Sequence, residues 1–364
     1  MKIAFIDRSG ANSIWSVLYS IATVLVLSGH EVTFFKVDDG QQRETLPVPE
    51  GTREVRIPVP TANGFFSLIY QQIYLFFSLL NIARKNSFDI VHANFINPAW
   101  LARIVFHLYK VKIVNTRHEL SGSMSRHWRI ADRLTEKFID SQVYISSTVA
   151  RSFSRSSDND SNCIIMNGID VHAFDKPVKD LISPNRPTVI TVGRFVKVKG
   201  HSVLISAWAD VIEKHPNARL ILVGDGPERH NLECQCAKQN VLSSVEFPGW
   251  MSKQDAHRLI KQARMMVVPS DGSQEGFGLV VAEAMASRTP LICSDIPVFR
   301  EVASNTADYF SPGNYEELSK AIISMLDDKN RANKMANKAA SRVSELFDES
   351  TMAESYINLY YKLL

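Results

Sequence analysis

The sequence has few cysteines and little net charge, and each scarcity excludes a class of protein. Its 364 residues include four cysteines, and the closest pair, Cys234 and Cys236, is spaced too tightly for a usual zinc site. So few thiols without a pairing pattern are typical of a reducing compartment. Lysine and arginine exceed aspartate and glutamate by only 41 − 38 = 3 charges, which indicates no nucleic-acid partner.

Long hydrophobic segments are scarce as well. Residues 1–7 are too short an apolar run for the central part of a signal peptide, and they are typical of a buried strand. Residues 65–83 are long enough to cross a bilayer, which takes about 20 residues. The polar side chains of this predicted helix all share one side except that of Gln72, and those on the shared side are Ser67, Gln71, Ser78 and Asn81. We therefore interpret the segment as a helix that packs on the protein or lies in an interface, and not as a membrane span.

Positive charge is concentrated in one part of the chain. Residues 84–137 contain ten lysines and arginines and four acidic residues, a local charge of 10 − 4 = +6. Two interpretations remain open. These charges are solvated on helix surfaces, or they form a surface that meets anionic lipid or a phosphate-bearing acceptor. The second interpretation predicts peripheral contact with an anionic membrane.

Short apolar runs alternate with helical periodicities along the chain, which predicts an α/β protein with parallel sheets. Pro177, Pro184 and Pro187 predict a stiff hinge. We expect a first domain over residues 1–183, completed by residues 347–364, and a second domain over residues 184–346. Two such domains facing each other would place a ligand cleft at the carboxyl ends of their strands.

A glycine and two cations follow the predicted strand Thr188–Val192. Gly193 allows a ligand to approach the backbone closely. Arg194 can form a planar fork on a phosphate, and Lys199 adds a point charge a few residues later. On its own this pattern also fits an exposed basic turn, but beside the elements that follow it predicts a diphosphate site.

A second glycine-rich element begins at Glu275. Gly276 and Gly278 expose backbone N–H groups, and a helix predicted from Leu279 would direct its positive end towards an anion. Glu283 lies in that helix among apolar neighbours, so solvation explains it poorly. Because carboxylates accept hydrogen bonds from hydroxyl groups, Glu275 and Glu283 together predict a polyol ligand such as ribose or a hexose.

Weaker elements follow other predicted strands. Gly224 begins a glycine turn, Gly10 follows the first strand, and His118 follows a later strand of the first domain, where a lone histidine is more often structural. The string Asp158-Asn159-Asp160 resembles a metal-binding D-x-D sequence. It lies in a serine-rich loop away from the two cations, so we predict no metal.

In order and spacing, these elements resemble the large retaining family 4 of glycosyltransferases, which has the GT-B fold. The resemblance covers the whole chain and is strongest in three strings: Gly193-Arg194 with Lys199-Gly200, residues 223–227, and residues 269–290. It implies two facing Rossmann-like α/β domains, with a C-terminal helix that crosses back to the first domain. In such enzymes the second domain binds a nucleotide-sugar donor and the first binds the acceptor.

The resemblance also assigns roles to residues. Arg194 and Lys199 would hold the donor diphosphate, and Glu283 would bind the ribose. Glu275 would bind the sugar, and His118 would lie near the sugar that is transferred. The other donor-binding residues that it implies are Gly10, Gly193, Gly224, Trp250, Met251, Gly276, Phe277, Gly278 and Leu279. No cofactor and no metal is expected, since the two cations would neutralise the phosphates.

The expected activity is transfer of a hexose from a nucleotide-sugar to a hydroxyl group, with retention at the anomeric carbon. The expected acceptor is a lipid-linked sugar or an oligosaccharide in bacterial cell-surface polysaccharide, lipopolysaccharide or glycan assembly. The expected location is the cytoplasm, with peripheral contact at the inner face of the cytoplasmic membrane. Two alternatives remain: a nucleotide-sugar epimerase of the same fold, and an inactive glycosyltransferase-like binding subunit.

Overall fold

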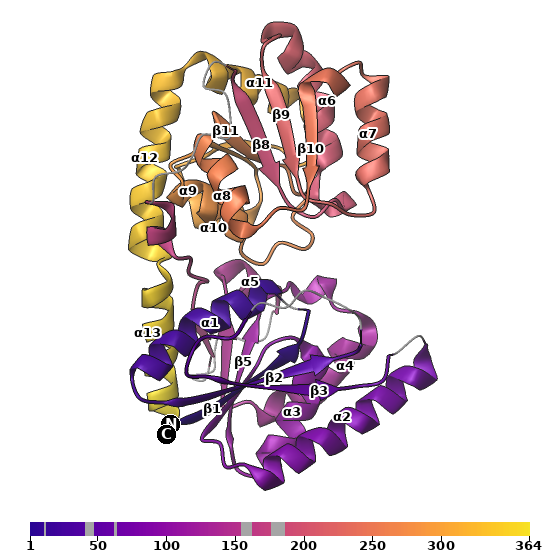
Figure 1. Cartoon of the computed structure of the whole chain (residues 1–364), viewed down its shortest axis with the longest axis vertical. Helices are drawn as coiled ribbons and strands as arrows, with labels where there is room; N and C mark the ends of the chain where they lie inside the picture. The colour runs from indigo at the N-terminus through magenta and orange to yellow at the C-terminus, as the bar shows by residue number, and fades with distance from the viewer. Residues whose placement is uncertain (11, 41–46, 62–63, 154–161, 176–185) are drawn as a thin grey trace. The chain divides into compact units, whose positions relative to one another are not determined.

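The computed structural model describes residues 1–10, 12–40, 47–61, 64–153, 162–175 and 186–364. Their contacts divide the chain into two compact units (Figure 1). The first unit is Met1–Gly168 with Glu349–Leu364, and the second is Ile169–Asp348. The predicted boundary between residues 183 and 184 lies outside the described residues. Each unit is a parallel sheet covered by helices on both faces, so the predicted α/β class is confirmed.

The sheet of the first unit has seven described strands in the order β3-β2-β1-β4-β5-β6-β7, with every neighbouring pair parallel. This strand order reverses direction beside β1, as it does in dinucleotide-binding sheets. The strands are β1 (Lys2–Arg8), β2 (Glu31–Asp38), β3 (Arg53–Pro58), β4 (Ile90–Ala93), β5 (Lys112–Arg117), β6 (Ser141–Tyr144) and β7 (Asn162–Ile164). The helices are α1 (Asn12–Leu27), α2 (Phe65–Lys85), α3 (Ile96–Leu108), α4 (Arg126–Thr135), α5 (Ser147–Ser152) and α13 (Glu349–Leu363).

The sheet of the second unit has six described strands in the order β10-β9-β8-β11-β12-β13, again parallel. The strands are β8 (Thr188–Val192), β9 (Arg219–Val223), β10 (Val245–Gly249), β11 (Met265–Val268), β12 (Leu291–Ser294) and β13 (Asp308–Phe310). The helices are α6 (His201–Lys214), α7 (Arg229–Lys238), α8 (Lys253–Gln262), α9 (Leu279–Ala286), α10 (Pro297–Ala303), α11 (Tyr315–Asp327) and α12 (Lys329–Leu346).

The packing of strand β1 explains why its four central residues, Ile3 to Ile6, are all apolar. Successive side chains of a strand point to opposite faces of the sheet. Ile3 and Phe5 pack into a cluster with α1 and α13, whereas Ala4 and Ile6 pack on the other face with α2 and α3. Because helices cover both faces, no position of the strand core reaches solvent.

Helix α13 returns to the first unit, as predicted for the end of the chain. It packs beside α1 (Figure 1), and the side chains of Tyr356 and Tyr360 are buried in the first core. The hydroxyl of Tyr360 lies 2.7 Å from Nδ1 of His92, whose Nε2 lies 2.8 Å from Oγ1 of Thr116. Burial lowers the pKa of His92 to about 3, so this ring is neutral and joins the helix to β4 and β5 through hydrogen bonds.

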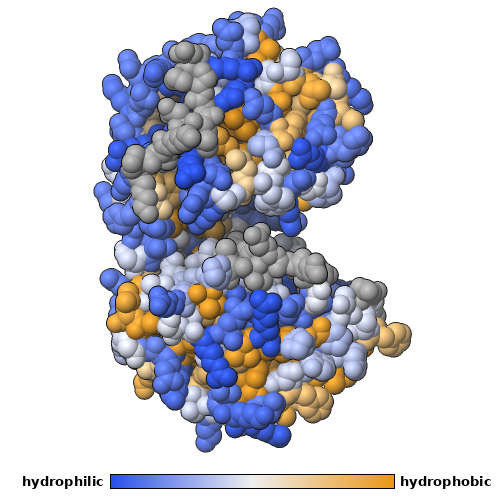
Figure 2. Space-filling view, viewed as in Figure 1, coloured by the Kyte–Doolittle hydropathy of each residue, from blue (hydrophilic) through white to orange (hydrophobic). Residues whose placement is uncertain are grey.

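Helix α2 is the one described helix that is long and apolar enough to cross a membrane by length and composition. Its inner side packs on the sheet through Leu75, Leu79 and Ala83, which are buried. Its outer side carries exposed apolar and aromatic side chains, and they are Phe66, Ile69, Tyr70, Ile73, Tyr74 and Phe77. The helix is therefore packed on one side, and its apolar outer side is uncovered within the described part of the chain. Figure 2 shows that hydrophobic residues reach the surface in the lower half of the view, where the first unit lies.

Candidate functional site

The turns after β8 and β9 touch each other through their backbones. The amide of Gly193 donates to the carbonyl oxygen of Val223 over 3.0 Å. A Cβ atom at Gly224, whose φ is 134°, would collide with the carbonyl of Gly193. Only glycine fits there, and the contact leaves the carboxyl ends of the two central strands free of side-chain bulk.

The two predicted cations differ in their surroundings. The side chain of Arg194 is exposed and has no hydrogen bond or ion pair within the described part of the chain. Lys199 instead places its Nζ 2.6 Å from Oε1 of Glu275. The Lys199 side chain is 32% exposed and that of Glu275 is 8% exposed, so the pair is sheltered but can be reached from solvent. Lys199 is thus held in one position, while Arg194 is free to bind an anion.

The loop before α9 is tied to the turn that carries Lys199. Val198 accepts two hydrogen bonds at its carbonyl oxygen, from the Ser270 hydroxyl at 3.0 Å and from the Asp271 amide at 2.9 Å. Gly200 adopts a left-handed φ of 69°, and a Cβ atom there would collide with the backbone of Pro269. These contacts bring Glu275 to Lys199 although 76 residues separate them.

Gly278 caps the amino end of α9 with a left-handed φ of 87°. A Cβ atom at this position would lie 2.7 Å from the ring of Phe299. The backbone N–H groups of the first turn of α9 are the groups that a phosphate or sugar oxygen could use. The ring of Phe277, by contrast, is buried and packs edge-on against Phe347 at 5.5 Å between centroids. Phe277 therefore offers its backbone to a ligand, not its side chain.

Glu283, further along α9, has a partner that the sequence did not reveal. Its Oε1 lies 3.3 Å from Nε2 of His257 on α8, and both side chains are mostly buried. The His257 ring in turn packs on the ring of Phe174 at 4.3 Å between centroids. No spacing rule connects these three residues, because they come from separate elements that meet only in the folded unit. Nε2 of His257 makes no hydrogen bond within the described residues, so the ring lies beside the Glu283 carboxylate without fixing its orientation.

Trp250 and Met251 follow β10, next to β9 at the edge of the second sheet. The Trp250 side chain is 69% exposed, which is unusual for so large an apolar ring. An exposed indole at the carboxyl end of a strand is available to stack on a flat ring such as a nucleobase.

Two predicted residues lie in the first unit. Gly10 follows β1, where the amide of neighbouring Ser9 donates to Val37 over 2.8 Å. His118 follows β5, and its Nε2 lies 3.0 Å from Oδ1 of Asn94. Burial lowers the pKa of His118 to about 3, so the imidazole is neutral at physiological pH. The other predicted site residues all belong to the second unit.

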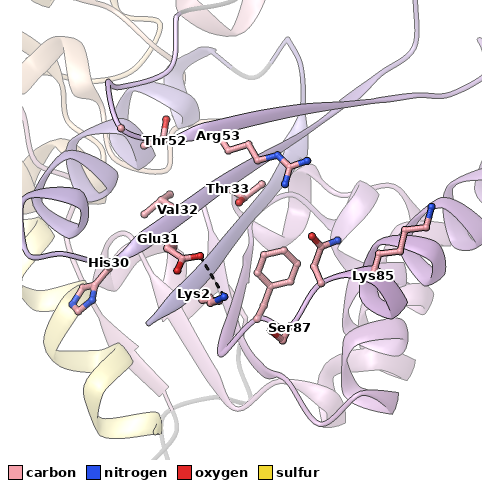
Figure 3. Close-up of a pocket in the computed structure, with 12 residues that line it drawn as sticks. Lys2, His30, Glu31, Val32, Thr33, Thr52, Arg53, Lys85 and Ser87 are labelled. Atoms are coloured by element: carbon pink, nitrogen blue, oxygen red, sulfur yellow. Dashed lines mark ion pairs between the residues drawn. The ribbon is translucent and has the colours of Figure 1, made fainter.

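A polar pocket of about 450 Å³ in the first unit contains none of the predicted residues. It lies where β1, β2 and β3 begin, and it is lined by Lys2, Glu31, Arg53 and Lys85 among others (Figure 3). Lys2 and Glu31 form an ion pair in it at 3.5 Å. Because ligands of open α/β sheets bind at the carboxyl ends of the strands, this pocket is on the wrong edge for the predicted chemistry.

One string of the sequence resembles a metal-binding D-x-D sequence. Asp158, Asn159 and Asp160 lie outside the described residues. Within the described ranges, no group of three or more histidine, cysteine, aspartate or glutamate side chains could hold a metal ion.

Two family models match the chain, one after the other. The model for glycosyl transferases group 1 matches residues 174–342, and the model for glycosyltransferase family 4 matches residues 14–173. The chain belongs to these glycosyltransferases. The recognition made from the strings around Gly193 and Glu275 is therefore confirmed.

Relatives of this glycosyltransferase align over nearly its whole length. It is 26% identical to phosphatidyl-myo-inositol mannosyltransferase of Mycolicibacterium smegmatis, over 93% of this chain and 87% of that protein. Among solved structures, sucrose-phosphate synthase of Thermosynechococcus elongatus superposes with a TM-score of 0.84 at 23% identity, covering 100% and 99% of the two chains. Anabaena HepE in complex with UDP-glucose gives 0.79 at 20% identity, covering 100% of each chain. The glycosyltransferase thus has the GT-B fold with two Rossmann-like units.

Proposed function

We propose that this glycosyltransferase transfers a hexose from a nucleotide-sugar to a hydroxyl acceptor with retention of anomeric configuration. The observation that carries the proposal is the pair of Lys199 and Glu275, 2.6 Å apart, beside exposed Arg194 at the carboxyl end of β8. Cations there suit a diphosphate, and a carboxylate there suits sugar hydroxyl groups. The likeness to HepE, which was solved with UDP-glucose, supports a nucleotide-sugar donor.

In the proposed reaction the bond between the anomeric carbon and the diphosphate oxygen breaks while negative charge grows on that diphosphate. Arg194, Lys199 and the amino end of α9 stabilise this charge, and they are worth most if they are positioned before the reaction starts. The ion pair with Glu275 positions Lys199 in this way. Glu275 keeps its second carboxylate oxygen for a sugar hydroxyl, and Glu283, which lies beside His257, binds the ribose.

The acceptor oxygen attacks the anomeric carbon from the face that the diphosphate leaves. Its proton passes to the departing phosphate oxygen, so the step balances without a cofactor or metal. In the first unit, His118 is neutral and donates through Nε2 to Asn94. Its Nδ1 can therefore accept a hydrogen bond from a hydroxyl of the transferred sugar.

For the acceptor we propose a lipid-linked sugar or an oligosaccharide in bacterial cell-surface polysaccharide, lipopolysaccharide or glycan assembly. The apolar outer side of α2 and the exposed cations Arg126, Arg129 and Arg133 of α4 support peripheral contact with an anionic membrane. The similarity to a phosphatidyl-myo-inositol mannosyltransferase is consistent with a lipid acceptor. We place the enzyme in the cytoplasm, at the inner face of the cytoplasmic membrane.

The proposal is tested by incubating the protein with a panel of UDP-, GDP- and ADP-sugars and measuring release of the nucleoside diphosphate. We expect one donor class to be consumed slowly with water and faster with acceptor. The anomeric configuration of the product, read by nuclear magnetic resonance, should match that of the donor. Interconversion of two nucleotide-sugars without release would instead indicate an epimerase, and binding without turnover would indicate a binding subunit.

A further inference from the structure

An open groove runs between α2, α3 and α4 in the first unit. Its volume is about 450 Å³, and almost all the surface inside it is apolar. Leu68, Ile73 and Phe76 line it from α2, Trp100 from α3, and Trp128 and Ala131 from α4. None of these residues has a role in the proposed transfer reaction.

Two polar side chains of the groove, Trp100 and Gln72, are already paired. The indole N–H of Trp100 donates to Oε1 of Gln72 over 2.9 Å, and the amide nitrogen of Gln72 lies 3.5 Å from Oδ1 of Asn97. A polar ligand would find few hydrogen-bond partners in the groove. A hydrocarbon chain, in contrast, makes no hydrogen bonds to water that it would have to give up on entering. Apolar cavities of this kind bind apolar molecules in preference to water.

The groove adjoins a second, polar pocket of about 240 Å³. Leu68 and Trp128 line both spaces, so the two are neighbours with a shared wall. The polar pocket is lined by Arg8, Ser9, Asn97 and the acidic Asp39 among others, where β1 ends. It therefore lies at the edge of the sheet where open α/β folds bind their ligands.

We propose that the groove and the pocket form one site for an amphiphile, which holds the hydrocarbon chain between α2 and α4 and the polar head beside Arg8. The site takes one hydrocarbon chain with a polar head that Arg8 can contact. That its occupant is the acceptor of the glycosyltransferase rests on the proposed function; that it binds an amphiphile does not. The two claims can thus fail separately.

Binding can be measured with cis-parinaric acid, a fatty acid whose conjugated tail fluoresces when nearby tryptophan transfers excitation to it. Trp100 and Trp128 are placed in the groove wall to act as the donors. The measurement uses the full chain and keeps the probe below the concentration at which it aggregates. We then expect energy transfer from tryptophan to the probe that saturates as probe is added. Decanoate, dodecanoate and tetradecanoate should displace the probe with affinity rising about fourfold for each methylene until the groove is full.

Variants test the placement of the chain. Ala131→Phe fills the groove, and we expect it to weaken probe binding at least tenfold. Ile130→Phe makes the same kind of enlargement one residue away, at an exposed position that does not line the groove, and should bind as the parent does. Ile73→Asp, at a half-exposed position of the groove wall, provides a second disruption without a risk to folding. Arg8→Gln should reduce the preference for dodecanoate over dodecanol.

Absence of saturable energy transfer would overturn the proposal, as would parental binding by both Ala131→Phe and Ile73→Asp. If Ala131→Phe changed the oligomeric state and left probe binding unaltered, the groove would instead be a contact surface for a second copy of the chain. Probe binding does not depend on a donor sugar. Loss of all transfer with intact probe binding would therefore count against the proposed function and leave the amphiphile site standing.

Discussion

Lys199 and Glu275 come from different loops of the second unit, and their side chains meet at 2.6 Å between Nζ and Oε1. The Glu275 carboxylate is almost fully removed from water, and this desolvation costs free energy that the attraction to Lys199 must offset. Stabilising the surface is therefore a poor explanation for this ion pair. The arrangement is better explained by the need to hold one ammonium group ready for an anionic ligand, with Arg194 next to it.

The first prediction concerns these two cations. Arg194→Ala and Lys199→Ala should each lower turnover by about 10²–10³, since losing one contact to a charge that grows in the transition state costs about 2.7–4 kcal/mol. Lys197→Ala is the matched control, because Lys197 lies in the same turn and is exposed. Nucleotide release is the readout, with melting temperature to verify folding. Parental turnover in either test variant would remove the diphosphate assignment.

Much of this site could be predicted because its signals are local. Gly193, Arg194 and Lys199 follow one strand directly, and a glycine-rich string next to a helix start marks Glu275. The pairing of Lys199 with Glu275 was not predicted, and neither was that of Glu283 with His257. Both pairs join separate elements, and no periodicity in the sequence reports which loops touch.

In the fold, too, elements with a clear local pattern could be predicted from the sequence, and elements without one could not. Strand β3 was not expected, because three of its six residues, Arg53, Glu54 and Arg56, are charged and the strand lies at the sheet edge. Strand β13, of three residues, is too short for a pattern to emerge. Strand β7, Asn162–Ile164, is equally short. Helix α13 was anticipated, since Tyr356 and Tyr360 recur at helical spacing and need a core.

A second prediction concerns metal. Nucleotide release should persist after dialysis against EDTA, because Arg194 and Lys199 can neutralise the diphosphate without a divalent ion. The rate with EDTA should equal the rate with added Mg²⁺ within the error of the measurement. A strict requirement for Mg²⁺ or Mn²⁺ that is lost in Asp160→Ala would contradict both the expectation and the interpretation of residues 158–160 as a solvated loop.

A third prediction follows from Asp7, at the end of β1. Burial raises the pKa of Asp7 from 3.8 to about 7, although the Arg8 amide donates to its Oδ1 over 2.7 Å. Its Oδ2 has no hydrogen-bond partner among the described residues. A carboxyl whose pKa is higher in the folded state stabilises the protein below the unfolded pKa, and this contribution is lost as the pH rises towards 7.

Asp7→Asn keeps the side chain neutral at every pH, so its advantage over the parent should grow as the pH rises. Between pH 5 and pH 8 the difference in free energy of unfolding should increase by about 2–3 kcal/mol, at 1.36 kcal/mol for each unit of pKa shift. Urea denaturation at the two pH values measures it. Asp210→Asn, at an exposed position of α6, is the control and should show no such trend. An equal effect of Asp7→Asn at both pH values would mean that Asp7 is charged in the folded protein.

The last prediction concerns the membrane. The outer side of α2 presents Phe66, Tyr70 and Phe77 to solvent, and each of these side chains is at least 60% exposed. On α4, Arg126, Arg129 and Arg133 recur on one side of the helix, next to exposed Ile130 and Leu134. The acidic residue of α4, Asp132, does not offset them, because it is buried in ion pairs with Arg103 and Arg117.

At about 1 kcal/mol for each basic residue near an anionic surface, three arginines give weak, salt-sensitive binding and not insertion. Co-sedimentation should therefore occur with phosphatidylglycerol vesicles at low salt, fall steeply at high salt, and be weak with phosphatidylcholine alone. Reversing Arg126 and Arg129 to glutamate should abolish it, whereas Arg53→Glu, at the start of β3, should not. No binding to anionic vesicles at low salt would leave the charges of α4 as ordinary solvated groups. Binding that survives high salt and a carbonate wash would mean that α2 inserts into the bilayer, contrary to the interpretation of residues 65–83 as a packed or interfacial helix.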